Sequence, residues 1–241
     1  MKKSILAAVM VAMVVAAWSG PAGATLITIG QAQYNGGNYN LIYDNDSPFG
    51  SIVWLDYSHS GGFWENQAAW AAGLGVSLTY ALDPAYAITW GGDWRLPNTV
   101  DGPSVLGYDG TTTAGYNIHN SELGHLYYVE LGNLGFLPGT YTQGDLFRKY
   151  SLPFNELNMM STYWSSTEYA SDLSNAWYFT TSIGYQGTSN KFNGWWGLAV
   201  RPAVVTSAQA TPSPVPEPST VFLLGAGLVG LAGWRLRRRD R

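Results

Sequence analysis

The chain has 241 residues, with 12 basic and 16 acidic side chains, a formal net charge of −4 and no cysteine. The lack of cysteine excludes disulfide bonds and thiolate metal sites, so a folded domain must be stabilised by its apolar core. The negative charge excludes the broad basic surface with which proteins neutralise nucleic-acid phosphates, so no nucleic-acid partner is expected.

The first 24 residues have the layout of a secretory signal peptide. Two lysines precede an apolar run over residues 5–18, and Ala22 and Ala24 provide the small-x-small pattern of a cleavage site. We therefore expect the general secretion machinery to export the chain, with residues 1–24 removed and the mature protein beginning at Thr25.

Residues 25–205 are the part of the chain that can build a folded domain. They include nine tryptophans, and they carry five basic against 14 acidic residues, a net charge of −9. About 180 residues suffice for one domain with a sizeable core, to which aromatic side chains contribute large buried areas. A single secreted α+β domain is predicted, with short antiparallel strands and two main helices.

Short strands separated by turns are predicted in the first part of this domain. β-Branched and aromatic residues favour strands at 25–29, 39–43 and 52–57, with a turn signal, Asn-Gly-Gly-Asn, at 35–38. Residues 44–50 have a faint likeness to a calcium-binding loop. However, a proline occupies the third ligand position and no glutamate closes the loop, so a solvated turn is predicted.

Two helices are predicted from apolar periodicity and end signals. Residues 63–74 have apolar and glutamine side chains at helical spacing, and Trp64 and Trp70 are interpreted as core residues rather than ligand platforms. A second helix is predicted at about 121–131, with one leucine-rich face and a following glycine. Asn120 is the expected N-cap.

The rest of the domain is predicted to consist of strands and loops. Residues 162–167 and 176–180 have the composition of paired strands, a turn is predicted at 184–187, and residues 195–202 form a last strand. The following residues, 206–214, are rich in Ser, Thr, Ala and Pro, so a flexible spacer is predicted there.

Several short motifs of the domain resemble a known family of secreted domains. They are Asp-Trp-Arg-Leu-Pro at 93–97, Glu-Leu at 122–123, Tyr-Trp-Ser-Ser at 163–166 and Val-Arg-Pro at 200–202. In this order they resemble the C-terminal domain of a bacterial collagen-like adhesin, over about residues 41–204. The resemblance implies an α+β fold related to C-type lectin-like domains, and it implies adhesion or glycan binding as the general role.

Arg95 and Glu122 are predicted to form a structural ion pair. Arg95 lies among tryptophans and leucine, and a partly buried guanidinium needs a partner. Glu122 occupies the glutamate position of the resembling family, in the first helical turn, where the helix dipole favours a carboxylate. Residues 98–120, an insertion relative to that family, would then be a loop closed at its base by this pair.

The chemistry-bearing residues do not assemble into a recognisable catalytic or metal-binding motif. The histidines are His59, His119 and His125, and Glu122 lies between the last two without a third ligand at a suitable spacing. No catalytic residue, metal ligand or cofactor is therefore predicted. Aromatic residues near the C-terminal strand offer a different site, a glycan platform formed by Tyr185, Trp195 and Trp196. The alternative is that the two tryptophans belong to a buried strand.

The last part of the chain has three consecutive segments. Val215, Pro216, Glu217 and Pro218 form a rigid polar motif, and an uncharged apolar run follows at 221–234. A basic tail then contains Arg235, Arg237, Arg238, Arg239 and Arg241.

This arrangement, over residues 215–241, resembles the PEP-CTERM sorting signal. The resemblance implies recognition of the Pro-Glu-Pro motif by exosortase, a membrane-embedded peptidase of Gram-negative bacteria that make extracellular polysaccharide. The short apolar run would hold the precursor transiently in the inner membrane, with the arginines on the cytoplasmic side. The alternative is a permanent single-span anchor.

Taken together, the residues favour an exported cell-surface or extracellular-matrix protein. It would be sorted and processed by exosortase, associated with exopolysaccharide or biofilm, and without catalytic activity. A glycan-binding adhesin with an aromatic platform is the alternative, and a hydrolase with an unrecognised site is the least favoured hypothesis.

Overall fold

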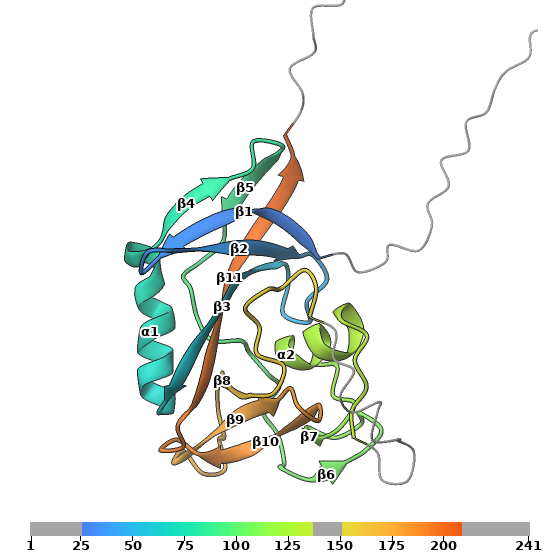
Figure 1. Ribbon diagram of the computed structural model, residues 1–241. Helices are drawn as coiled ribbons and strands as arrows, with labels where there is room; N and C mark the ends of the chain where they lie inside the picture. Colours follow the sequence, from blue (N-terminus) through green and yellow to red (C-terminus); the bar gives the residue numbers. More distant parts are fainter. Residues whose placement is uncertain (1–25, 137–150, 209–241) are drawn as a thin grey trace, which may run out of the picture.

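Strand β11 (Trp195–Ser207) is the element to which the other parts of the fold connect. The computed structural model describes residues 26–136 and 151–208 (Figure 1). β11 pairs antiparallel with β3 (Ile52–Gly62) and β5 (Tyr86–Trp90), and parallel with β8 (Thr162–Glu168). Its length allows it to serve three neighbours at different points along its course.

The remaining strands extend the sheet on both sides of β11. The strand order is β4-β1-β2-β3-β11-β8-β9-β10-β7-β6, and β5 joins β11 outside this path. The remaining strands are β1 (Ile27–Tyr34), β2 (Gly37–Asp44), β4 (Thr79–Leu82), β6 (Leu106–Gly107), β7 (Ala114–Gly115), β9 (Asn175–Thr180) and β10 (Tyr185–Asn190).

A tight turn joins β1 and β2. Tyr34 pairs with Gly37, so only Asn35 and Gly36 form the loop, and both have positive φ angles, 48° and 81°. Two positive φ values are the requirement of a type I′ turn, whose twist matches that of the strands it joins. The Asn-Gly signal in the sequence is therefore used as predicted.

The central strands are buried on both faces because side chains alternate along a strand. Leu41 and Val53 enter one apolar cluster, whereas their neighbours Ile42 and Trp54 enter a second one. Helix α1 (Trp64–Ser77) packs against the first cluster.

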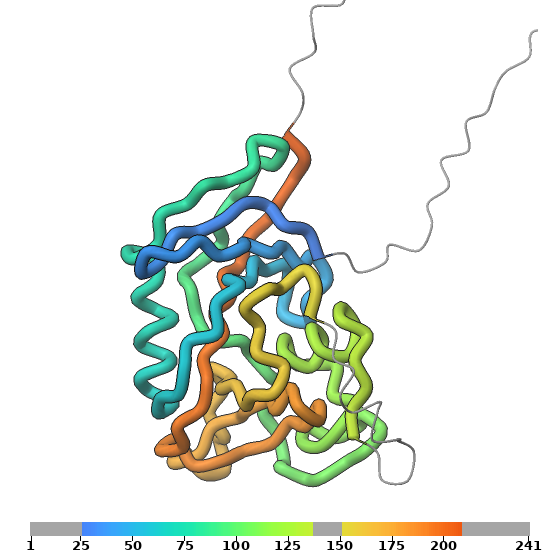
Figure 2. The backbone as a smooth tube through the Cα atoms, viewed as in Figure 1, coloured from blue at the N-terminus to red at the C-terminus, as the bar shows by residue number. Residues whose placement is uncertain are grey.

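The second apolar cluster is covered by a composite helix and by an irregular segment. The helix consists of α2 (Glu122–His125) and the π-helix η1 (Leu126–Glu130). The segment at 151–161, yellow in Figure 2, adds Phe154 and Leu157 to this cluster. Figure 1 shows α1 and α2 on opposite sides of β3 and β11.

The prediction of one domain with two helical segments is confirmed, and the domain is rich in sheet. Several boundaries differ from the predictions. The predicted turn at 184–187 is wrong, because Tyr185 already begins β10, and the strands at 79–82 and 86–90 were not predicted. Thr206 and Ser207, placed in the spacer, instead pair with β5. No helix among the described residues is long and apolar enough to cross a membrane.

Candidate functional site

The residues predicted for export and sorting lie outside the described part of the structure. They are Ala22 and Ala24 of the cleavage site, Val215, Pro216, Glu217 and Pro218 of the sorting motif, and Arg235, Arg237, Arg238, Arg239 and Arg241 of the basic tail. The candidate sites described below therefore all belong to the folded domain.

Arg95 and Glu122 meet in a two-pronged ion pair. Nη1 of Arg95 donates to Oε2 of Glu122 at 2.7 Å, and Nη2 donates to Oε1 at 2.8 Å. The Glu122 side chain is fully buried, whereas 26% of the Arg95 side chain is exposed. The planar guanidinium matches the two carboxylate oxygens, and such charged hydrogen bonds are stronger than neutral ones. The structure thus brings together the two residues that the sequence pairs.

The ion pair closes the base of the insertion at 98–120. The N–H of Asn98 donates to Oε2 of Glu122 at 2.6 Å, and the N–H of Glu122 donates to the carbonyl of Asn98 at 3.0 Å. Further along, Trp177 Nε1 donates to Asp101 at 2.7 Å, and Gln186 Nε2 donates to the carbonyl of Thr113 at 2.9 Å. The insertion is therefore docked on β9 and β10 rather than projecting freely.

The motifs at 93–97, 163–166 and 200–202 converge around this pair. Arg95 and Val200 exchange two backbone hydrogen bonds, each of 2.9 Å. The carbonyl of Pro97 accepts from the Ser165 hydroxyl and from the Ser166 N–H, both at 2.8 Å. Motifs far apart in the sequence thus form one structural unit, and Glu122 supplies its charge balance.

The predicted aromatic platform is split by the alternation of β11. Trp195 packs between Trp164 and Tyr178, with ring centroids 4.4 and 4.3 Å away, beside the first apolar cluster. Trp196 packs against the second cluster. Because consecutive strand residues face opposite sides, the two tryptophans do not share a surface. Tyr185 contacts Tyr178 on the same side as Trp195.

A group of tyrosines lies where the insertion meets β10. Tyr108 is 43% exposed and stacks on Tyr116 with a centroid separation of 5.5 Å, and Tyr116 meets Tyr185 edge-on at 5.3 Å. Burial, followed by the neighbouring tyrosines, raises the pKa of Tyr116, and burial likewise raises the pKa of Tyr185. These hydroxyls therefore stay neutral near pH 7 and can donate hydrogen bonds.

Four ionisable side chains, here called the His125 cluster, converge where β2 ends beside η1. Asp44 ends β2, Asp46 follows in the loop, His125 ends α2 and Glu130 ends η1. One ligand-type atom of each residue lies within 4.8 Å of the others. Nε2 of His125 is 3.3 Å from Oδ1 of Asp46 and 3.4 Å from Oε1 of Glu130.

Burial and mutual charge shape the electrostatics of the His125 cluster. Burial raises the pKa of Asp44 to about 6, opposed by the Trp54 Nε1 hydrogen bond of 3.1 Å and reinforced by the charge of Glu130. Burial lowers the pKa of His125, but the carboxylates of Glu130, Asp44 and Asp46 raise it by more, so the net shift is upward from 6.5. The three carboxylates therefore favour the protonated imidazole, whereas burial favours the neutral form of Asp44.

Glu130 reaches this cluster because η1 is wider than an α-helix. The N–H of Leu131 donates to the carbonyl of Leu126 at 2.9 Å, a bond that spans five residues. In an α-helix, residues five apart point roughly 140° apart around the axis, whereas the wider π turn brings His125 and Glu130 toward one side. Sequence reasoning missed Glu130 because α-helical spacing places it on a different face of the helix from His125. It missed Asp44 and Asp46 because residues 44–50 were compared only with a calcium-binding loop.

The other histidines have ordinary packing roles. Nδ1 of His59 lies 2.7 Å from Oε1 of Gln67, and its ring stacks on Trp70 at 4.5 Å. His119 is exposed and lies against Tyr128 with a ring separation of 5.3 Å. Neither contact resembles a ligand set.

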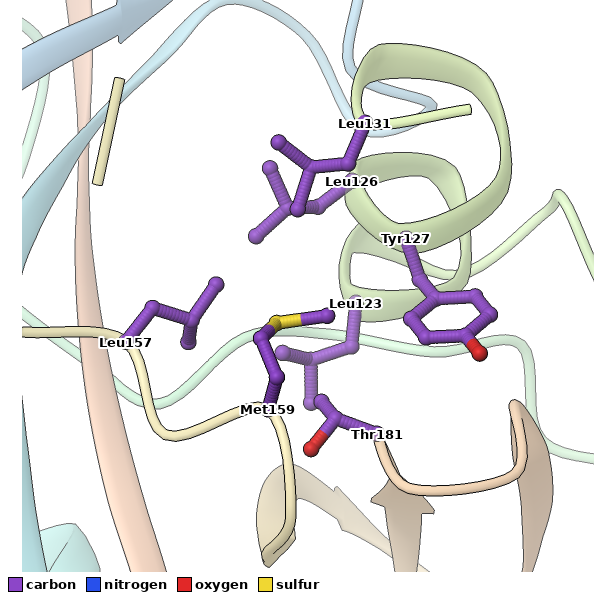
Figure 3. A pocket seen from close by; sticks show the side chains of 7 residues that line it. All are labelled: Leu123, Leu126, Tyr127, Leu131, Leu157, Met159 and Thr181. Carbon is purple, nitrogen blue, oxygen red and sulfur yellow. The ribbon is translucent and has the colours of Figure 1, made fainter. Parts of the chain in front are cut away.

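An apolar pocket lies beside η1 (Figure 3). Its lining consists of Leu123, Leu126, Tyr127, Leu131, Leu157, Met159 and Thr181. The Thr181 hydroxyl lies 3.0 and 2.9 Å from the carbonyls of Asn158 and Ser161, so it is already engaged. The pocket is a gap in the second apolar cluster and offers little polar chemistry.

Comparison with known proteins gives a match in the C-terminal part of the chain. A family model described as the PEP-CTERM protein-sorting motif matches residues 214–239. No curated protein and no solved structure matches the chain significantly. The predicted PEP-CTERM sorting signal is confirmed by the family match, and the motif indicates that exosortase processes this chain and that the protein is sorted to the cell surface.

Proposed function

We propose that the domain at 25–205 acts without catalysis at the cell surface or in the extracellular matrix, in association with exopolysaccharide. The observation that carries this proposal is the sorting motif at 214–239, which begins shortly after β11 ends at Ser207. A folded domain followed closely by a sorting signal is the part of the protein that is delivered to the surface. The PEP-CTERM resemblance implies a host that makes extracellular polysaccharide.

The arrangement around Arg95 and Glu122 supports a structural rather than a catalytic use of this ion pair. Both carboxylate oxygens of Glu122 are already engaged by Arg95, and Oε2 also accepts from Asn98. A general acid or base needs an oxygen within hydrogen-bonding reach of a substrate proton. Glu122 is fully buried and its oxygens are occupied, so it is unsuited to that role.

The fold relation to C-type lectin-like domains is part of the same proposal. Its support is the convergence of the motifs at 93–97, 163–166 and 200–202 with Glu122 in one unit. Motifs that contact one another depend on the same packing, so they are expected to occur together in proteins of one fold. Motifs scattered over the surface would not depend on one another in this way.

Glycan binding at the tyrosine group of Tyr108, Tyr116 and Tyr185 is the second candidate function. The specific observation is the stacked Tyr108–Tyr116 pair, of which Tyr108 is 43% exposed. Aromatic faces offer apolar area to the C–H faces of sugars, and neutral hydroxyls add directed hydrogen bonds. This group replaces Trp195 and Trp196 as the candidate platform, because those side chains pack against separate core clusters.

The cell-surface proposal is tested by fractionating cells of an exosortase-containing host. The parent protein should be recovered with the extracellular polysaccharide, and it should be released into the medium by a strain unable to make that polymer. A chain in which Pro216, Glu217 and Pro218 are all replaced by alanine should remain in the inner membrane. Equal release of the parent protein from both strains would refute the polysaccharide association.

The glycan-binding candidate is tested separately by affinity electrophoresis through gels containing the host's purified exopolysaccharide. Tyr108→Ala should reduce the retardation of the mature protein. Phe192→Ala, at an aromatic residue that is 76% exposed elsewhere on the domain, is the matched control and should migrate as the parent does. Unchanged retardation of Tyr108→Ala would remove the tyrosine group from consideration.

A further inference from the structure

We propose that Asp44, Asp46, His125 and Glu130 bind one divalent transition-metal ion of the Zn²⁺ or Mn²⁺ class, which ties the end of β2 to η1. The proposal is independent of the surface function described above, because it uses neither the sorting motif nor the tyrosine group. It assigns a cation site to residues for which the sequence predicted a solvated turn and an ordinary helix.

The separations within the His125 cluster suit a shared ion. A tetrahedral ion with bonds of about 2.0–2.1 Å holds its ligand atoms roughly 3.3–3.4 Å apart. Nε2 of His125 lies 3.3 Å from Asp46 Oδ1 and 3.4 Å from Glu130 Oε1. The ligand atoms of all four residues, including Asp44, lie within 4.8 Å of one another. A small inward movement would therefore complete the ligand set.

The carboxylate of Glu130 provides a second and independent indication of a ligand. Only 1% of its side chain is exposed, yet Oε1 makes no hydrogen bond of acceptable geometry, and its one contact within the cluster is the 3.4 Å ion pair with Nε2 of His125. Leaving a buried charged oxygen unsatisfied costs free energy, so such atoms are rare unless something binds them. A cation between Glu130, Asp44 and His125 would supply the missing partner.

The described part of the chain offers no lysine or arginine to neutralise the cluster. Its three such cations are engaged elsewhere: Arg95 pairs with Glu122, Lys191 pairs with Glu168, and Arg201 donates to the carbonyl of Gly92. Among described groups, three carboxylates therefore converge on a single imidazole, and one divalent ion would balance most of this charge.

The ligand types indicate the class of ion. Imidazole is a ligand of Zn²⁺ and other transition metals, whereas Ca²⁺ and Mg²⁺ take oxygen ligands. Ca²⁺ also needs six to eight oxygens, and the cluster offers four residues of which one is His125. A four-residue set without an obvious open position fits a structural ion better than a catalytic one.

Metal titration of the processed protein after chelation tests the site. Calorimetry with Zn²⁺, Mn²⁺ and Ca²⁺ should show one Zn²⁺ or Mn²⁺ per chain and much weaker binding of Ca²⁺. The melting temperature should rise by several degrees at saturation, because an ion that binds only the folded state stabilises it. An absence of stoichiometric binding of Zn²⁺ and Mn²⁺ would overturn the proposal, and tighter binding of Ca²⁺ would overturn the assignment of ion class.

Conservative variants distinguish this site from adventitious binding. Asp46→Asn is the first choice because 42% of the Asp46 side chain is exposed and folding should be unaffected. This variant and Glu130→Gln should each weaken the ion by at least roughly tenfold, the lower end of what disturbing a metal's surroundings costs. The matched controls are His119→Gln and Glu65→Gln, which replace an exposed histidine and an exposed carboxylate elsewhere. Should the controls lose binding as much as folded Asp46→Asn does, the ion is held nonspecifically and the proposal fails.

Without added metal, Asp46→Asn should melt at nearly the same temperature as the parent, because its contact with His125 is at a side chain that is 42% exposed, and an exposed ion pair contributes little. With Zn²⁺, its melting temperature should fall below that of the parent. This reversal separates loss of a ligand from a general loss of stability, and a variant that is equally destabilised in both conditions would contradict the assignment.

Discussion

Arg95 shows how one buried charge pair can organise motifs that are distant in the sequence. Its guanidinium holds the fully buried Glu122 carboxylate, while its backbone pairs with Val200 of β11. Removing either partner leaves the other charge without compensation in a place that water reaches poorly, and this loss exceeds what the intact pair contributes. The pair therefore matters mainly because the packing of the surrounding motifs requires both charges to be present.

Replacing either member of this pair should destabilise the domain strongly. Arg95→Ala and Glu122→Ala are each expected to lower the free energy of unfolding by about 3–5 kcal/mol, measured by urea denaturation. The double variant should lose less than the sum, because the two changes remove the same interaction. Glu65→Gln, at an exposed carboxylate, serves as the control. Additive losses would show that the two residues act separately.

Lys191 is a poor control for this experiment, because its ammonium group has two partners. It pairs with Glu168 and lies 4.4 Å from the ring centroid of Trp64. Exposed ion pairs contribute up to about 1 kcal/mol, and a cation over a ring adds a comparable amount. A small but measurable loss is therefore expected for Lys191→Ala.

Asp44 should make the stability of the metal-free domain depend on pH. Its pKa is about 6 in the folded state against 3.8 for the unperturbed group, so the folded state keeps a proton that the unfolded state has lost between these values. Stability should therefore fall as pH rises from about 4 to 6, by roughly 3 kcal/mol, and then level off. His125, with its raised pKa, loses its contribution in the same direction above pH 6.5.

Urea denaturation from pH 4 to 7.5 in the presence of a chelator measures this dependence. The difference between the parent and Asp44→Asn isolates the Asp44 contribution from that of other carboxyl groups. A parent whose stability rises relative to Asp44→Asn across this window would contradict the sign. Saturating Zn²⁺ should flatten or reverse the slope, because metal ligands bind in their deprotonated forms.

At the scale of elements, the start of α2 depends on a residue adjacent to the predicted one. Ser121 is buried and its hydroxyl accepts from the N–H of Gly124 at 3.0 Å, whereas the expected cap, Asn120, is exposed. Both residue types are good caps, so the choice depends on which one has the extended backbone at the helix boundary. Ser121 has this conformation, with φ −117° and ψ 151°.

Ser121→Ala should therefore destabilise the domain, whereas Asn120→Ala should not. The expected loss for Ser121→Ala is about 1 kcal/mol, the usual contribution of a cap, and thermal unfolding measures it. Because His125 ends α2, the loss of the helix cap should also leave the His125 side chain less firmly held. Equal effects of the two substitutions would show that the cap assignment is wrong.

Strand β11 gives its two tryptophans different surroundings. Trp195→Ala removes a ring that lies between Trp164 and Tyr178, so a loss of about 3 kcal/mol in unfolding free energy is expected. The mature protein should nevertheless keep its retardation in polysaccharide gels if it remains folded. Loss of retardation by a folded Trp195→Ala protein would restore this residue as a ligand platform.

At the scale of the whole molecule, processing should leave the folded domain without either end of the precursor. The sorting motif lies at 214–239, after the last described strand, so cleavage near it leaves β11 intact. Mass spectrometry of extracellular protein should show a chain that begins near Thr25 and contains no peptide from 221–241. Recovery of the arginine tail on secreted protein would contradict exosortase processing and favour a permanent anchor.

Local sequence alone determined the features whose chemistry lies within a few neighbouring residues. The sorting motif at 214–239 is a contiguous pattern. Asn35 and Gly36 suit a two-residue hairpin turn because both tolerate positive φ. The pairing of Arg95 with Glu122 is not local in this sense: a partly buried arginine needs a carboxylate, but the resemblance to the adhesin domain family and the helix start at 122 singled out Glu122 as the partner.

Only the tertiary structure decided the features that depend on register and on helix pitch. Strand alternation sends Trp195 and Trp196 to opposite clusters, and β5 forms because residues 203–207 of β11 extend past the other strands to meet it. The His125 cluster joins Asp46 to a histidine 79 positions away, and the π turn rotates Glu130 toward it. Propensity acts over neighbouring residues, whereas these contacts are set by the packing of the entire chain, which is why local patterns could not reveal them.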